Sequence, residues 1–278
     1  MGDFERKVLE AVEYIKGIIK FKPDIAIILG AGLNSLAYEI QTPIEVPFED
    51  IPHFKSSTVP GTEGKLIFGL VYDRSVVALQ GRLHCYDGYS MEDVTFPIRV
   101  FTLLGVEVLI VTSAVGGVNP NLKIGDLVLV KDHLGLGCES PLIGPNYRTF
   151  GPRFPSLKGV YERALIDAAK SVAAEIKFNV TEGVYAFMTG PQYTTEAEAK
   201  MFRALGADVV GFSMVPEVIV AAHSGMSVLG IAYVTNVLGV AEAAHTHNEI
   251  LEVVSKEEKN FTALVLDTIK RIEIENEF

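Results

Sequence analysis

Residues able to bind an anion follow a short apolar run within residues 76–88, VVALQGRLHCYDG. The run has the length and composition of a buried strand, and the glycine that ends it is followed by Arg82, His84, Tyr86 and Asp87. Buried strands of open α/β sheets present ligands just beyond their carboxyl ends. The planar Arg82 guanidinium and the His84 imidazole together favour a small polar or anionic ligand. The alternative is that Arg82 pairs with Asp87 on a surface loop.

Composition limits the classes of protein that the chain can belong to. Its 278 residues, of which 49% are hydrophobic, predict one domain over residues 1–278 with a large core. The formal net charge of -11 argues against a nucleic-acid partner, because binding a phosphate backbone requires a basic surface. Any anion is therefore expected to bind at a local site.

The sequence also predicts where the protein is located. Two cysteines, Cys85 and Cys138, are too few for a disulfide framework and fit a reducing compartment. No apolar segment is long enough to span a bilayer, and the first twenty residues have the pattern of an amphipathic helix rather than a signal peptide. We expect a cytoplasmic protein without a membrane partner.

Strands and helices alternate along the chain, which predicts an α/β fold with a central mixed β-sheet flanked by helices. Helices are expected at residues 4–19, 91–104, 161–176, 196–205 and 250–275, and a further helix is expected to begin near residues 212–217. Strands are expected at residues 24–29, 65–72, 75–80, 107–112, 183–188, 208–211 and 227–235. Residues 43–64 and 131–158 are rich in Gly and Pro and are expected to be irregular, the second segment as a lid or an interface.

Several of these strands end in loops that could face one ligand. The strand at residues 24–29 is followed by Gly30-Ala31-Gly32, the strand at 107–112 by residues 113–117, and the strand at 183–188 by residues 190–196. Ser213 is expected near the positive end of a helix, where it could contact an anion. The first loop is a weak match to a dinucleotide fingerprint, because Ser35 occupies the third glycine position.

Five motifs, in order and spacing, resemble those of the trimeric purine nucleoside phosphorylases. They are IILGAGL at residues 27–33, GRLHCYDGY at 81–89, GPRFP at 151–155, GADVVG at 206–211 and VPEV at 215–218. The resemblance covers essentially the whole chain. It implies a nucleoside phosphorylase-like fold and a homotrimer that cleaves purine nucleosides with inorganic phosphate, giving free base and ribose 1-phosphate. Phosphate is then a co-substrate, and no cofactor or metal is expected.

The resemblance also implies a role for individual residues. The phosphate site would comprise Ala31 in the first glycine loop, Arg82, His84, the Ala114 backbone N–H and Ser213, with Ser35 as a substitute donor. Ribose contacts would be Tyr86, Phe212 and His247, with Phe150 reaching into the neighbouring subunit, and base contacts would be Tyr193, Thr194 and Asn236. His84, Asn236 and His247 would be catalytic. The transition state, a sugar cation between phosphate and a departing base, needs anion donors on one side and a donor to the base on the other.

Three positions depart from the family pattern. Ala31 replaces a serine whose hydroxyl would bond phosphate, Thr194 replaces a glutamate that reads the purine ring, and Phe212 replaces a methionine under the sugar. A neutral Thr194 hydroxyl can donate or accept, so the sequence predicts broadened base specificity that includes adenosine or cytidine beside inosine and guanosine.

Two other functions fit parts of the same pattern. One is a methylthioadenosine phosphorylase, which should prefer an apolar pocket at the sugar 5′ end, where His247 is polar. The other is a catalytically weak nucleoside-binding protein, which the losses at Ala31 and Thr194 make conceivable. His245 and His247 form a weak metal motif, because they stand in a helix-start loop without the combined carboxylate and cysteine set of a metal site. His223, on an apolar helix, is expected to be a hydrogen-bonded core residue, and Cys85 a packing residue.

Overall fold

The computed structural model describes residues 2–30, 35–58, 64–238 and 247–273, and the side chains of all of these except 247–257. The described residues form one nine-stranded sheet in the order β2-β3-β4-β1-β5-β8-β7-β6-β9, with a further pairing of β5 and β9. The strands are β1 Ile25–Ile28, β2 Gln41–Pro47, β3 Lys65–Val71, β4 Arg74–Gln80, β5 Val108–Gly117, β6 Leu127–Leu134, β7 Val180–Phe187, β8 Val209–Gly211 and β9 Ser227–Val237. Parallel and antiparallel pairs both occur, so the predicted mixed sheet is confirmed.

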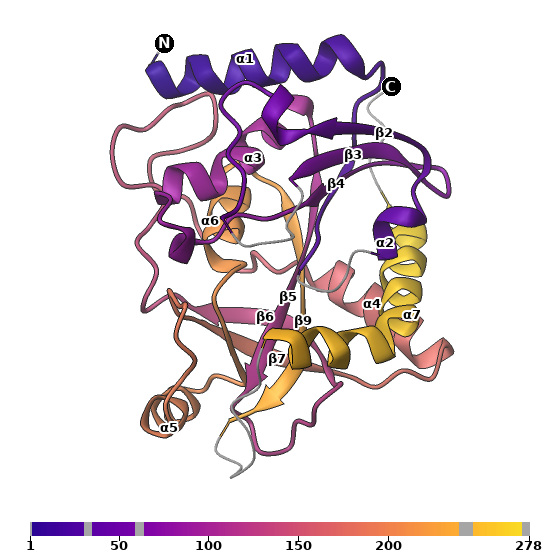
Figure 1. The fold of residues 1–278 in the computed structure, drawn as a ribbon, viewed down its shortest axis with the longest axis vertical. Coiled ribbons are helices and arrows are strands. Elements are labelled where there is room, and N and C mark those ends of the chain that lie inside the picture. Colours follow the sequence, from indigo (N-terminus) through magenta and orange to yellow (C-terminus); the bar gives the residue numbers. More distant parts are fainter. Residues whose placement is uncertain (1, 31–34, 59–63, 239–246, 274–278) are drawn as a thin grey trace.

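Helices cover the sheet on two sides (Figure 1). They are α1 Asp3–Ile18, α2 Ser35–Tyr38, α3 Met91–Leu104, α4 Arg163–Glu175, α5 Glu196–Ala204, α6 Val215–His223 and α7 His247–Arg271, with short 3-10 helices η1 Phe48–Asp50 and η2 Cys85–Asp87. Helices α1, α3 and α6 pack against one another on one side, and α2, α4 and α7 lie together on the other. The two layers bury both faces of the central strands, as parallel strands require.

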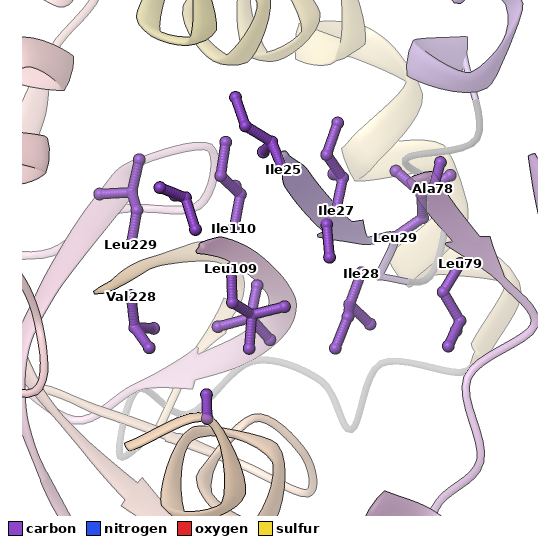
Figure 2. Close-up of a cluster of buried hydrophobic side chains, with 14 of the residues drawn as sticks. Ile25, Ile27, Ile28, Leu29, Ala78, Leu79, Leu109, Ile110, Val228 and Leu229 are labelled. Atoms are coloured by element: carbon purple, nitrogen blue, oxygen red, sulfur yellow. The ribbon is translucent and has the colours of Figure 1, made fainter. Parts of the chain in front are cut away.

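The core sits on the aliphatic strands β1, β4, β5 and β9. Figure 2 shows Ile25 and Ile27 of β1 pointing to one face and Ile28 to the other, with Leu109 and Ile110 of β5 divided in the same way. All five side chains are at most 1% exposed. Because successive strand residues face opposite sides, burial on both faces requires the uninterrupted apolar runs from which these strands were predicted.

Strand β5 joins two parts of the sheet (Figure 1). It pairs with β1 on one edge and β9 on the other, and its last residues also pair with β8. Because β8, β7, β6 and β9 pair in series, β5 closes these strands into a ring. The carboxyl ends of β4 and β5, the end of β9 and the start of α6 all supply residues to the site described below.

The structure corrects the predicted elements at three places. Residues 43–64 were expected to be irregular, but β2 runs from Gln41 to Pro47 as an edge strand; Pro43 lies where the register shifts between Gln41 and Ile44, so its missing N–H breaks no ladder bond. The loop expected at residues 113–117 is strand, because β9 pairs with β5 as far as Gly117. Residues 131–134, expected to be irregular, complete β6.

Candidate active site

Arg82 lies beyond the end of β4 and is buried. Gly81, with a φ of 88°, turns the chain there, and only 7% of Arg82 is exposed. Its Nη1 donates to the Thr112 carbonyl oxygen on β5 at 2.9 Å, and its Nε lies 2.9 Å from Oε1 of Glu217 on α6. The alternative of a surface pair with Asp87 is therefore wrong. The guanidinium is held between β5 and α6, at the edge of the sheet where strand-end ligands bind.

Asp87 instead organises the loop that carries His84. Its carboxylate accepts from the His84 backbone N–H at 2.9 Å and from the Thr58 hydroxyl at 2.7 Å. This capping interaction fixes the single turn of η2 and sets the direction in which the His84 side chain leaves the backbone. Residue Asp87 is thus structural, whereas the neighbouring Arg82 and His84 remain available for a ligand.

His84 is neutral at physiological pH. Burial and, to a smaller extent, the nearby Arg82 charge lower the pKa of its imidazole to about 3. The ring stacks on Tyr86 with centroids 4.7 Å apart, and its Nδ1 has no hydrogen-bond partner among the described residues. A neutral imidazole keeps one N–H donor, so His84 can donate to an anion beside Arg82 without adding a second buried positive charge.

Ser213 is anchored by a buried hydroxyl network. Its Oγ lies 2.8 Å from Ser113 Oγ on β5, and its backbone N–H donates to the Tyr185 hydroxyl at 3.2 Å. Ser113 Oγ is also 3.3 Å from that Tyr185 hydroxyl, which connects β5, β7 and the turn before α6. Sequence reasoning missed Ser113 and Tyr185 as site residues. Ser113 stood in a predicted loop that could have indicated it, but Tyr185 lies in the buried second half of β7, where no sequence pattern distinguishes it.

Ala114 follows Ser113 in β5 and is opposite Tyr233 of β9 in the parallel ladder. It is partly exposed, unlike the strand residues on either side of it. The Ser113 hydroxyl donates to the Ala114 carbonyl oxygen at 3.2 Å, so the Ala114 backbone lies beside the Ser113–Ser213 hydroxyl pair. A phosphate contact from its N–H stays a prediction.

Three aromatic side chains, those of Tyr86, Phe212 and Tyr193, lie beside the loop that carries Arg82 and His84. Tyr86 meets Phe212 edge to face with ring centroids 6.3 Å apart, and Phe212 lies 6.0 Å from Tyr193. Burial raises the pKa of the Tyr86 phenol to about 12, so the hydroxyl stays protonated. The three residues come from η2, the turn after β8 and the loop before α5. Their meeting confirms that these loops, far apart in sequence, face one another.

Thr194 and Asn236 are the residues expected to read the base. The Thr194 hydroxyl donates to the Met188 sulfur at 3.3 Å, a weak bond that a stronger acceptor can replace. Asn236 is partly buried in β9 opposite Gly116, and its Oδ1 accepts from the Thr235 hydroxyl at 3.4 Å. Asn236 was expected just after this strand; the structure places it one residue before the last residue of the strand.

Four predicted contacts are displaced or lie outside the described parts. Ala31 is outside the described residues, as is the His247 side chain, although His247 begins α7. The Ser35 hydroxyl is 2.9 Å from that of Thr262 on α7, so it ties two helices together and its substitution for the lost serine stays a prediction. Phe150 does not reach outward: it is 2% exposed, because it packs on Phe4 and under the Arg99 guanidinium.

The expectation for His223 is met. His223 is 4% exposed and its Nδ1 lies 2.6 Å from Arg99 Nη1, which confirms a hydrogen-bonded core residue. In the irregular segment that was expected to contact a neighbour, the exposed aromatic residue is Phe154, at 87%. The part of the chain that the structure describes contains no group of three or more His, Cys, Asp or Glu that could hold a metal ion.

The donors of the Arg82–His84 loop therefore lie beside a cluster of three aromatic rings. A model of the phosphorylase superfamily matches residues 24–270, so the chain belongs to this superfamily. The chain is 45% identical over 268 residues to purine nucleoside phosphorylase 1 of Bacillus subtilis, covering 96% of this chain and 99% of the relative. It is 41% identical over 259 residues to the purine nucleoside phosphorylase of Bos taurus, covering 89% and 90%. The family resemblance predicted from the motifs is confirmed.

Solved structures show the same fold. Isoform 2 of the Schistosoma mansoni purine nucleoside phosphorylase, in complex with cytosine and ribose-1-phosphate, superposes with a TM-score of 0.92 at 42% identity, covering 97% of this chain and 98% of that chain. A Schistosoma mansoni purine nucleoside phosphorylase in complex with adenosine gives a TM-score of 0.92 at 40% identity, with the same coverage. The predicted α/β fold, with a central mixed sheet flanked by helices, is therefore confirmed.

Proposed function

We propose that this protein catalyses the reversible phosphorolysis of purine nucleosides to free base and ribose 1-phosphate. The observation that carries the proposal is the Arg82 guanidinium, buried at a strand end, with donors that no described residue uses. The neutral His84 beside it and Ser213 complete a set of anion donors, and the Tyr86, Phe212 and Tyr193 rings provide an aromatic cluster for contact with sugar and base. Purine nucleoside phosphorylases that are 45% and 41% identical to this chain support the assignment.

The geometry fits a reaction whose transition state is a sugar cation. The bond between sugar and base breaks while a phosphate oxygen approaches the anomeric carbon from the opposite face. Arg82 and His84 hold and orient that phosphate, so its negative charge lies beside the developing positive charge of the sugar. The base leaves with added negative charge, which the Asn236 amide stabilises by donating a hydrogen bond. Inorganic phosphate is the co-substrate, and no cofactor takes part.

Base specificity is expected to be broad. Thr194 holds only a weak bond to the Met188 sulfur, so its hydroxyl is able to turn and donate to a 6-oxo ring or accept from a 6-amino ring. Related Schistosoma structures contain adenosine, inosine, guanosine or cytosine. These complexes support adenosine, and less directly a pyrimidine nucleoside, as substrates beside inosine.

The working unit is a cytoplasmic homotrimer in which neighbours complete one another's sites. Two features support this assembly. The long segment at residues 135–158 contains no helix or strand, and it exposes Leu136, Ile143 and Phe154 at 67%, 71% and 87%. Exposed apolar side chains in one segment are typical of an interface. Within this segment, Phe154 rather than the buried Phe150 is exposed enough to reach a partner. No helix within the described ranges combines the length and apolar character needed to cross a membrane.

The proposal is tested by a substrate panel with and without phosphate. Inosine, guanosine, adenosine, methylthioadenosine, cytidine and uridine are incubated with the protein, and base release is followed by absorbance or chromatography. We expect phosphate-dependent release with inosine and adenosine among the turned-over substrates. A marked preference for methylthioadenosine would instead indicate the methylthioadenosine phosphorylase activity, and binding without release would indicate a nucleoside-binding protein.

A further inference from the structure

The buried ion pair of Arg82 and Glu217 has an unusual geometry. Arg82 Nε and Glu217 Oε1 are 2.9 Å apart, and the two side chains are 5% and 3% exposed. Nevertheless, within the described ranges neither Nε nor Nη2 of Arg82 donates a hydrogen bond, and neither oxygen of Glu217 accepts one. The carboxylate therefore neutralises the guanidinium by proximity while leaving its N–H directions free. Buried carboxylates usually accept several hydrogen bonds, so this arrangement calls for an explanation.

The two Arg82 nitrogens without a hydrogen-bond partner, Nε and Nη2, are neighbours that can donate in parallel to one anion. Nη1 is occupied by the Thr112 carbonyl oxygen, which leaves Nε and Nη2 along one edge of the guanidinium plane. Two adjacent N–H donors on one edge match two oxygens of a phosphate or of a carboxylate. The same edge can therefore bind either phosphate or, after a small rotation, Glu217. The two anions compete for one cation.

The surroundings of the pair make this competition strong. The pair lines a pocket with the apolar side chains of Ile28, Leu79 and Phe96, where charges are poorly screened. Lys55 and Asp93 line the same pocket and are of opposite charge, so together they add little net charge. The Glu217 charge contributes to the raised pKa of the Cys85 thiol, after burial, and the Arg82 charge contributes to the lowered pKa of His84. The fields of both groups thus reach the loop that forms the phosphate site.

From this geometry we propose that Glu217 is a positioning residue for the phosphate site: it is the internal counter-ion of Arg82, and phosphate binds against its charge. The inference rests on the proposed function, because it assigns phosphate to the Arg82 fork. In the empty site, Glu217 offsets the cost of burying a guanidinium, since an unpaired buried charge is strongly destabilising. In the occupied site, its charge repels phosphate and so favours release of phosphate and of ribose 1-phosphate. Glu217 therefore stabilises the enzyme that has no phosphate bound and lowers its affinity for phosphate.

The test uses Glu217→Gln, which keeps the size of the side chain and one oxygen acceptor but removes the charge. We expect the phosphate KM and the phosphate Kd to fall by about tenfold, the order of magnitude for removing a charge that acts on a poorly screened anion. We also expect a lower Tm in phosphate-free buffer and a larger rise in Tm on adding phosphate than in the wild type, because phosphate then supplies the missing counter-charge. A merely structural role would lower Tm without strengthening phosphate binding.

Two further variants keep the test decisive. Glu217→Asp retains the charge and is expected to retain the wild-type phosphate KM. Asp208→Asn is the control for loss of a partly buried carboxylate elsewhere: Asp208 accepts from the Val184 N–H and the Asn119 amide, so its loss should lower Tm and leave the phosphate KM unchanged. If Glu217→Gln is unstable, it is purified and compared in phosphate buffer.

The outcomes separate this inference from the proposed function. If wild-type base release requires phosphate but Glu217→Gln leaves the phosphate KM unchanged or raises it, the counter-ion role is wrong and the proposed function stands. The same conclusion follows if Glu217→Asp shifts the phosphate KM as much as Glu217→Gln does. If the wild-type protein neither requires nor binds phosphate, the proposed function itself fails.

Discussion

Replacing Arg82 by Lys tests the phosphate site without leaving Glu217 unpaired. The lysine ammonium keeps the positive charge, so the buried carboxylate retains a counter-ion and the large cost of an uncompensated buried charge is avoided. What is lost is the planar fork, because one ammonium cannot both reach the Thr112 carbonyl and offer two parallel donors to phosphate. The change therefore probes recognition of the anion more directly than a change to Ala.

The expected size of the effect follows from the number of bonds lost. Losing one of the two charge-assisted hydrogen bonds of the fork costs about 1.5–3 kcal/mol, which corresponds to a decrease of about 10- to 150-fold in kcat/KM for phosphate. The assay is the initial rate of base release from inosine at varied phosphate concentration. The rate at saturating phosphate should fall less than kcat/KM, because bound phosphate still has a cation beside it.

A matched control comes from the other buried arginine of the region. Arg99 is 6% exposed, and it contacts His223 and the Phe150 ring outside the site. Arg99→Lys should lower Tm and leave the phosphate dependence unchanged. The reasoning is refuted if Arg82→Lys retains the wild-type kcat/KM for phosphate, or if Arg99→Lys reduces it by as much.

Three further predictions concern His84, Thr194 and Ser113. Because burial and Arg82 hold the His84 pKa near 3, below its ordinary value of 6.5, the unfolded state binds more protons between these values, and the contribution of His84 to the free energy of unfolding falls as pH decreases through this window. NMR should show no titration of His84 between pH 8 and 5, and a midpoint near its ordinary 6.5 would contradict its burial. Thr194→Glu should shift the ratio of kcat/KM toward inosine and guanosine over adenosine by about 1.5–3 kcal/mol, the value of a charge-assisted hydrogen bond; an unchanged ratio, or a wild-type preference for inosine of several orders of magnitude, would show that Thr194 does not read the base. Ser113→Ala removes the 2.8 Å contact to the Ser213 hydroxyl and should raise the phosphate KM by about 2- to 10-fold, the worth of one neutral hydrogen bond; a phosphate KM equal to that of the wild type would mean that the hydroxyl network does not orient Ser213.

The parts of the fold that the sequence predicted well have strong local patterns. The strands at β1, β4 and β5 are uninterrupted aliphatic runs. Helix α3 was predicted despite Pro97, because its apolar residues recur at helical spacing and Gly105, which has a φ of 93°, ends it. Strand β2 has no such pattern. It lies at an edge with mostly exposed side chains, so its strand conformation depends on pairing with β3 rather than on its own residues.

Site residues could be predicted where they follow a strand directly in the sequence. They could not be predicted where the fold brings together residues that are distant in the sequence. Arg82, His84 and Tyr86 form one loop after β4, so their proximity could be read from the chain. Glu217 is far away in sequence on an apolar helix, and only the packing of α6 at the end of β4 brings it to Arg82. Phe150 was misplaced because sequence shows that an aromatic is present but not whether it faces the core; Phe4 and Tyr147 enclose it.

The central claim is that phosphate bound at Arg82 attacks the nucleoside, and the products of wild-type turnover test it most directly. Inosine is incubated with the protein and inorganic phosphate, and the products are followed by phosphorus NMR and by chromatography of the base. The account predicts that hypoxanthine and ribose 1-phosphate appear in equal amounts and that base release stops when phosphate is omitted. Release of hypoxanthine with free ribose, at a rate independent of phosphate, would contradict it.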